Sequence, residues 1–157
     1  MRFAQQIKGV QRISLIGSIC TAQNDPKDID FVVEISADVD WQQLAARGRR
    51  LKGRAQQANR GADIFLVRDG CYIGRICHYR ECFPRRACQA LHCGKTPHLN
   101  DDLSTLQLRR EAFEAPAVTL WPDLQRRAKL PEDLDAFLTA LEVPANRPLQ
   151  PTSGSGS

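Results

Sequence analysis

Three short features of the sequence carry residue types that could do chemistry together. The first is Gly17-Ser18, which follows the apolar run 13–16, and the second is the pair Asp28 and Asp30, which opens another apolar run. Side chains two residues apart on a strand project from the same face, so the two carboxylates would lie together. A Gly-Ser turn offers backbone N–H groups and a hydroxyl to a phosphate, and paired carboxylates suit a hard cation. The stretch therefore predicts a site for metal-assisted phosphoryl or nucleotidyl transfer.

The third feature is Asp63, a single acid near the start of the apolar segment 62–67. If this segment and segment 28–35 are neighbouring strands, Asp63 can lie beside Asp28 and Asp30. Three carboxylates on adjacent strands can hold two Mg²⁺ ions, roughly 3.5–4 Å apart, which clamp both reacting oxygens of an in-line displacement.

These residues, in this order, resemble the motifs of the nucleotidyltransferase superfamily with the DNA polymerase beta-like fold. The resemblance covers about residues 10–68, and the chain length is similar to that of a minimal, stand-alone member. It implies that Gly17 and Ser18 bind the β- and γ-phosphates of a nucleoside triphosphate. It also implies that Asp28, Asp30 and Asp63 hold the metal ions and that Asp63 helps to activate an acceptor hydroxyl. The implied reaction moves a nucleoside monophosphate to that hydroxyl and releases pyrophosphate.

One part of the sequence departs from the family pattern. The loop 19–27 lacks the arginine that many relatives carry soon after the serine, and it places Lys27 directly before Asp28. We expect Lys27 or the arginines of the next helix to neutralise the triphosphate. The acceptor stays open between a protein side chain, an RNA 3′ end and a small molecule.

The elements that must position these residues follow from hydrophobic periodicity and from turn signals. They predict an α+β fold, a nucleotidyltransferase-like mixed β-sheet flanked by helices, with a small C-terminal extension. Residues 1–70 would form the core, 71–143 an extension in the same globular domain, and 144–157 a disordered tail that ends in a Ser-Gly linker. Strands are expected at 12–19, 28–35, 62–67, 71–79, 103–108 and 118–121, and helices at 3–9, 41–60, from Pro84 to Gly94, 122–129 and 131–141.

Composition sets the broad class. The 157 residues are 42% hydrophobic and 25% charged, which is ordinary for a globular protein. The net charge of +4 is compatible with an anionic substrate but too weak to indicate nucleic acid by itself. No apolar run approaches the ~20 residues that span a bilayer, and the N-terminus lacks a signal-peptide core. We expect a cytoplasmic protein with no membrane partner.

Cysteine and histidine residues are dense between positions 71 and 98. Without a secretory signal the six cysteines are interpreted as thiols or ligands rather than disulfides. A structural zinc site could come from Cys82, Cys88, His92 and Cys93. No Cys-x-x-Cys pair occurs, however, and the alternative is buried thiols with histidines at the surface.

Two polar regions have open roles. His98, Asn100 and Asp101 could line the acceptor or base pocket, with His98 as a proton acceptor, or could simply form a turn. The helix at 41–60 carries six basic residues between 47 and 60, which could contact a phosphate or an acidic partner, or form a solvated face.

Two hypotheses in which binding is the main function compete with the transferase; the first allows residual transferase activity. One is an antitoxin-like or regulatory protein on the same fold, which would pair with a helical protein as toxin–antitoxin partners do. The other is a zinc-stabilised nucleic-acid-binding module built on residues 71–98.

Overall fold

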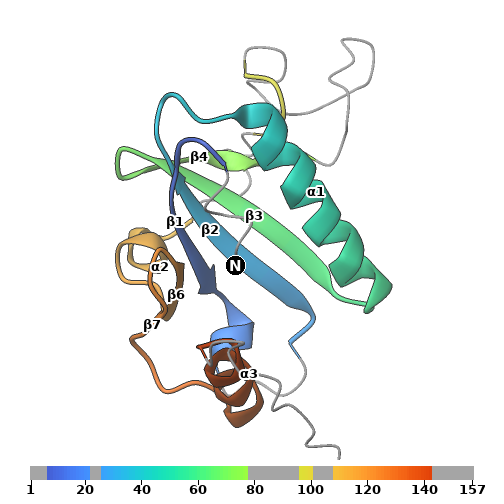
Figure 1. Cartoon of the computed structure of the whole chain (residues 1–157), viewed down its shortest axis with the longest axis vertical. Coiled ribbons are helices and arrows are strands. Elements are labelled where there is room, and N and C mark those ends of the chain that lie inside the picture. Colours follow the sequence, from blue (N-terminus) through green and yellow to red (C-terminus); the bar gives the residue numbers. More distant parts are fainter. Residues whose placement is uncertain (1–6, 22–25, 78–95, 101–107, 143–157) are drawn as a thin grey trace, which may run out of the picture.

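The structure, a computed structural model, describes residues 7–21, 26–77, 96–100 and 108–142. These residues form one mixed β-sheet with α-helices packed on it (Figure 1). The strands are β1 (Val10–Ile16), β2 (Asp28–Ile35), β3 (Gly61–Arg68), β4 (Cys71–Ile76), β5 (Leu99–Asn100), β6 (Val118–Trp121) and β7 (Gln125–Arg126). The helices are the short 3₁₀ turn η2 (Ser18–Cys20), α1 (Trp41–Gln57), α2 (Arg110–Glu114) and α3 (Glu132–Glu142).

The seven described strands lie in the order β5-β4-β3-β2-β1-β6-β7. Only β2 and β3 pair in parallel, and the other neighbours pair antiparallel. A parallel pair needs a crossover connection, which α1 supplies between β2 and β3. The predicted α+β class with a mixed sheet is therefore confirmed.

Helix α1 begins at Trp41, the predicted start. The Asp40 side chain accepts a hydrogen bond from the backbone N–H of Gln43 at 2.9 Å and caps the first turn. Gly48 lies against the sheet so closely that a Cβ atom there would come within 2.6 Å of Ile76 Cδ1. The helix ends at Gln57, three residues before the predicted end.

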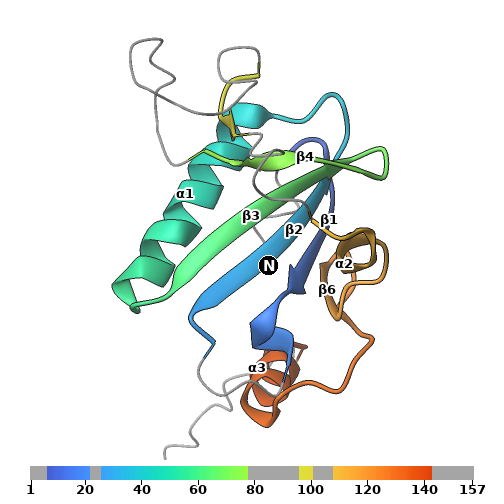
Figure 2. The same ribbon diagram turned by 180° about the vertical axis from the view of Figure 1, so that it is seen from behind.

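Both faces of the sheet carry a core. On the face covered by α1, Val33 and Ile35 of β2 are buried. Helix α2 lies on the opposite face (Figure 2). There Val32 packs against Phe65 of β3 and Phe113 of α2. Both the odd-numbered and the even-numbered residues of β2 therefore contribute to a core, because α2 covers part of the second face.

Several predicted boundaries were wrong. The first strand ends at Ile16 rather than Ile19, because Gly17 turns the chain into η2 at a φ of 79°. Segment 122–129 is not a helix: the chain reverses and β7 pairs with β6, which satisfies backbone groups at the sheet edge. Strand β5 and helix α2 were not predicted. The strand predicted at 71–79 is described only to Cys77 and ends at Ile76.

Other predictions fall outside the described residues. They are the helix from Pro84 to Gly94, nearly all of the strand at 103–108, most of the helix at 3–9 and the tail 144–157. Among the helices that the structure describes, none is both long and apolar enough to cross a membrane.

Candidate functional site

The sheet brings the three predicted motifs to one end. Strand β1 runs antiparallel to β2, so its last residue, Ile16, pairs with Asp30 near the start of β2. Strand β3 runs parallel to β2, and its Asp63 pairs with the same Asp30. The Gly17 turn and Asp28 lie at this same end, because they directly follow β1 and open β2. The site is therefore assembled by strand register, from residues up to 46 positions apart in the sequence.

Gly17 lies in contact with the central carboxylate. Its φ of 79° and ψ of −162° fall in a backbone region that is essentially restricted to glycine. A Cβ atom at this position would also approach Asp30 Oδ2 to 2.7 Å. After Gly17 the chain makes the single turn η2, in which the N–H of Cys20 donates to the Gly17 carbonyl at 3.1 Å. The predicted Gly-Ser turn is present and faces Asp30.

Asp28 and Asp30 project from one face of β2, and Asp30 is half-buried while Asp28 is exposed. Burial, followed by the negative charges of Asp63 and Asp28, raises the pKa of Asp30 from 3.8 to about 6. Gly61, opposite Asp28, leaves room for that side chain, since a Cβ atom there would collide with Asp28 Oδ1. These two carboxylates thus form a crowded negative pair, and a cation between them would relieve the repulsion.

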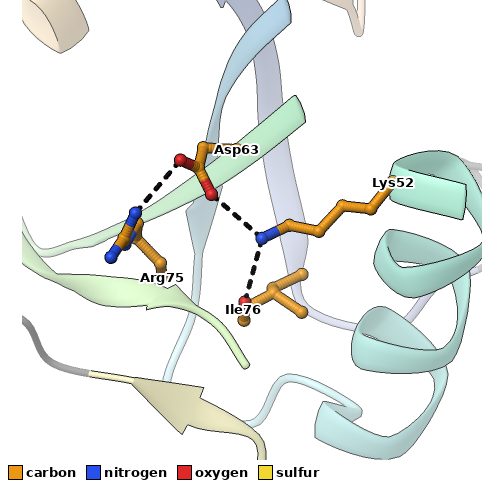
Figure 3. A network of polar contacts seen from close by, with 4 residues as sticks. All are labelled: Lys52, Asp63, Arg75 and Ile76. Carbon is orange, nitrogen blue, oxygen red and sulfur yellow. Dashed lines mark hydrogen bonds and ion pairs between the residues drawn. The ribbon is translucent and has the colours of Figure 1, made fainter. Parts of the chain in front are cut away.

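Asp63 has a different environment, because two basic side chains hold it. Its Oδ1 accepts from Lys52 Nζ at 3.0 Å and its Oδ2 accepts from Arg75 Nη1 at 3.0 Å (Figure 3). Lys52 reaches the site from α1 and also donates to the carbonyl of Ile76 at 3.3 Å. We call Lys52, Asp63 and Arg75 the Asp63 clasp. Burial opposes the charge on Asp63, but the two cations outweigh it and hold the pKa of this carboxyl below its usual value.

The environments of the three carboxylates indicate which of them could coordinate the predicted metal ions. Asp28 and Asp30 fit a divalent cation, since they share a face and have oxygen ligands of the kind Mg²⁺ prefers. Both oxygens of Asp63 are instead bonded to cations. Within the described ranges, no group of three or more His, Cys, Asp or Glu side chains is placed to hold a metal ion. Each Asp63 oxygen already accepts a hydrogen bond from a cation, and these two positive charges compete with a metal ion for the remaining lone pairs, so the two-ion arrangement stays a prediction.

The remaining predicted residues are divided between the two faces. Lys27 is exposed beside Asp28. Asn100 pairs with Arg75 across β4 and β5, which places it on the same face of the sheet as Asp63. His98 Nδ1 instead lies 3.4 Å from Arg49 Nη1 of α1, and burial and this arginine lower the His98 pKa. The structure therefore does not bring His98 to the carboxylates.

Other candidates cannot be located. Asp101 and the zinc set Cys82, Cys88, His92 and Cys93 lie outside the described residues, so these predictions are untested. The described cysteines form no disulfide: Cys20 and Cys77 are buried and Cys71 is exposed. Burial raises the pKa of the Cys20 thiol to about 11, which keeps it protonated.

The sequence did not reveal the two cations of the Asp63 clasp. Lys52 was assigned to the basic helix as a whole, although its position four residues after the buried Gly48 indicates a side chain directed at the sheet. The position of Arg75 in the site could not be predicted because the pairing of β3 with β4 is irregular. The pairing of β3 with β4 shifts between Leu66 and Val67, and this shift brings Arg75 opposite Phe65, on the Asp63 face.

Comparison with curated proteins gave no match, and comparison with solved structures gave none either. A match came from the protein families. Residues 1–93 match DUF6932, a family of unknown function. The matched segment spans more than half of the 157 residues and contains the Gly17 turn, Asp28, Asp30 and the complete Asp63 clasp. The chain belongs to the DUF6932 family.

Proposed function

We propose that this protein is a Mg²⁺-dependent nucleotidyltransferase that moves a nucleoside monophosphate from a nucleoside triphosphate to a hydroxyl acceptor. The observation that supports the proposal is the meeting of Gly17, Asp30 and Asp63 at one end of the sheet. Their order along the chain resembles that of the DNA polymerase beta-like superfamily. We also propose that the sheet and helices have the fold of that superfamily.

Each part of the site has a role in this proposal. Asp28 and Asp30 would hold Mg²⁺, which when bound neutralises phosphate charge and orients the triphosphate. The Gly17-Ser18 turn would contact the terminal phosphates. Lys52 and Arg75 stand beside this site and would add positive charge to that of Lys27, since the loop 19–27 contains no arginine. Most of the catalysis would then be positioning and electrostatic stabilisation.

In the proposed reaction the acceptor oxygen attacks the α-phosphorus. The bond from the α-phosphorus to the bridging oxygen breaks, and pyrophosphate leaves with the electron pair. The acceptor hydroxyl loses its proton, and the resemblance implies that Asp63 helps to remove it. The two cations that bond to Asp63 make it a weaker base, because both of its oxygens accept hydrogen bonds in this structure.

The Asp63 clasp also supports a second candidate function, a binding protein on the same fold. A chain whose third carboxylate stays paired could retain nucleotide without transferring it, and could act as an antitoxin-like or regulatory partner. The two candidates differ in one measurable respect: both require the carboxylates for nucleotide binding, but only the enzyme transfers the nucleotide.

Triphosphates labelled with ³²P at the α- or the γ-phosphate would test the proposal. The purified protein is incubated with Mg²⁺, each of the four triphosphates and a lysate as the source of acceptors. We expect acid-stable label from the α-position and none from the γ-position, because a nucleotidyl group retains only the α-phosphate. Asp28→Asn and Asp30→Asn should abolish the labelling. Asp123→Asn, the same change at an exposed turn, should not alter it.

Binding is measured in parallel by calorimetry with a non-hydrolysable triphosphate and Mg²⁺. Binding that depends on Asp30, without label transfer, would favour the binding protein. Neither binding nor transfer, or transfer that is equal in wild type and Asp30→Asn, would refute both candidates.

A further inference from the structure

A groove runs along α1 on the face of the sheet opposite Asp30 and Asp63. Its volume is about 320 Å³. The floor is formed by apolar side chains of three strands, Ile13, Phe31, Leu120 and Trp121, and the rim by exposed side chains of α1, Arg47, Arg50, Leu51 and Arg54. Helix α1 packs mainly over β3 and β4 (Figure 1). Ile13, Phe31 and Trp121, on the strands beside it, are only partly buried.

The complementary surface lies on α3 of the same chain. Leu138 of this helix is buried against the sheet. Phe137 and Leu141, four residues apart, instead form an outward apolar ridge, with 60% and 49% of their surfaces exposed. The first turn of α3 is acidic and contains Glu132, Asp133 and Asp135. Helix α3 therefore presents an apolar ridge with negative charge at one end.

These two surfaces account for every strongly exposed large hydrophobic side chain of the described residues. Phe137 and Leu141 belong to the α3 ridge, and the third, Leu51 at 38%, lies on the rim of the groove. The charges are also complementary, because the rim is basic and the first turn of α3 is acidic. Arg47, Arg50 and Arg54 follow about 10 Å of α1, a length that matches roughly two turns of a second helix.

We propose that the groove binds helix α3 of a second copy of this chain, with Phe137 and Leu141 on the apolar floor and the acidic turn near the α1 arginines. The groove and α3 lie on the same face of the sheet, since Phe31 packs against both the α1-side and the α3-side core. Two copies facing each other about a two-fold axis can therefore exchange both contacts. Such a reciprocal dimer buries two grooves and two ridges, as a closed two-fold assembly requires.

The dimer lies on the face away from the carboxylates, so it does not depend on the proposed transferase function. Sedimentation velocity over a concentration series gives the oligomeric state of the full chain. We expect a concentration-dependent dimer that weakens as salt rises, since charge pairs at the interface rim are screened. A wild type that stays monomeric at several hundred micromolar overturns the proposal.

Two surface variants test the contacts separately. Phe137→Asp removes the ridge and Arg50→Glu reverses a rim charge, and both positions are exposed, so circular dichroism should show an unchanged fold. Phe137→Asp should weaken dimerisation by about tenfold or more, the effect expected for a contact at the centre of an interface. Arg50→Glu should weaken it less and reduce its salt dependence, because it changes a charge at the rim. Arg109→Glu makes the same charge change at an exposed position next to α2 and should leave the dimer intact.

Mixing the two defective variants gives the sharpest result. Arg50→Glu retains an intact α3, and Phe137→Asp retains an intact groove, so the mixture can form one of the two contacts. With a fluorescent label on one variant, we expect a heterodimer that is weaker than the wild-type dimer, because one of its two contacts carries both changes. A mixture that associates as tightly as the wild type, or a dimer unchanged by Phe137→Asp, means that another segment or partner covers the groove.

Discussion

Replacing Asp30 by asparagine tests the electrostatics of the candidate site without any assumption about its substrate. Asp30 is half-buried beside two other carboxylates, and its pKa rises from 3.8 to about 6. A folded-state pKa above the unfolded value means that ionisation opposes folding. Above about pH 6 the wild type carries this penalty in full, and below about pH 4 it carries none. Asp30→Asn should therefore be the more stable protein at neutral pH.

The magnitude follows from the same rise. A pKa increase from 3.8 to about 6 corresponds to about 3 kcal/mol, which is an upper bound because water screens a half-buried group. We expect a gain of about 1 kcal/mol for Asp30→Asn at pH 7.5, or roughly 3 °C in Tm. The gain should shrink steadily between pH 6 and pH 4.5.

Urea unfolding at pH 4.5, 6.0 and 7.5 measures this difference, with Asp123→Asn as the matched control that should show no pH-dependent gain. Addition of Mg²⁺ should stabilise the wild type and leave Asp30→Asn unchanged. A variant that is less stable than wild type at pH 7.5, or a difference that does not vary with pH, would refute the reasoning. Equal stabilisation of both proteins by Mg²⁺ would refute Asp30 as a ligand.

Two further substitutions probe the neighbours of Asp30. Lys52→Met removes one cation from Asp63 and should cost about 1–2 kcal/mol in urea unfolding at pH 7, between the values for exposed and buried pairs; Lys129→Met, at an exposed position, should cost less than half as much. Because the pKa of Asp63 is lowered from 3.8, the ion-pair part of this cost should be lost as the pH falls below 3.8 and through the lower folded pKa, which leaves the part due to the bond with the Ile76 carbonyl; a cost that does not decrease would exclude the ion pair as its main cause. Gly17→Ala should cost about 1–3 kcal/mol because of its backbone angles. The cost should be smaller in an Asp30→Ala background, where the clash with Oδ2 is gone, and an equal cost in both backgrounds would show that the contact is absent.

The sequence was most informative where local pattern and side-chain chemistry agree. Segment 28–35 alternates along its length and forms β2 with the predicted bounds, and the pairing of Asp30 with Asp63 follows from a parallel β2–β3 arrangement. The turn at Gly17 was predicted from its residue type, but the early end of β1 was not, because apolar residues continue to Ile19.

The parts that could not be predicted depend on tertiary register. Arg75 joins the site only because the β3–β4 pairing shifts by one residue; a regular hairpin from the turn at 69–70 would put it opposite Ile64, on the α1 face. Helix α2 has five residues and only one buried side chain, Phe113, so its periodicity is too short to recognise. Segment 125–126 pairs with β6 because the sheet edge offers hydrogen-bond partners, and local propensity does not report such an edge.

The two central carboxylates of the site differ in whether basic side chains are bonded to them. Asp30 and Asp63 lie side by side in the register of β2 and β3, so both experience each other's charge. The fold supplies two cations, and both bond to Asp63. One of these cations would have stabilised the folded protein more if it were bonded to Asp30, where ionisation opposes folding. The crowded pair of Asp28 and Asp30 is therefore the position where an external cation gains most from binding, and this asymmetry is a physical reason to look for the metal at Asp28 and Asp30 first.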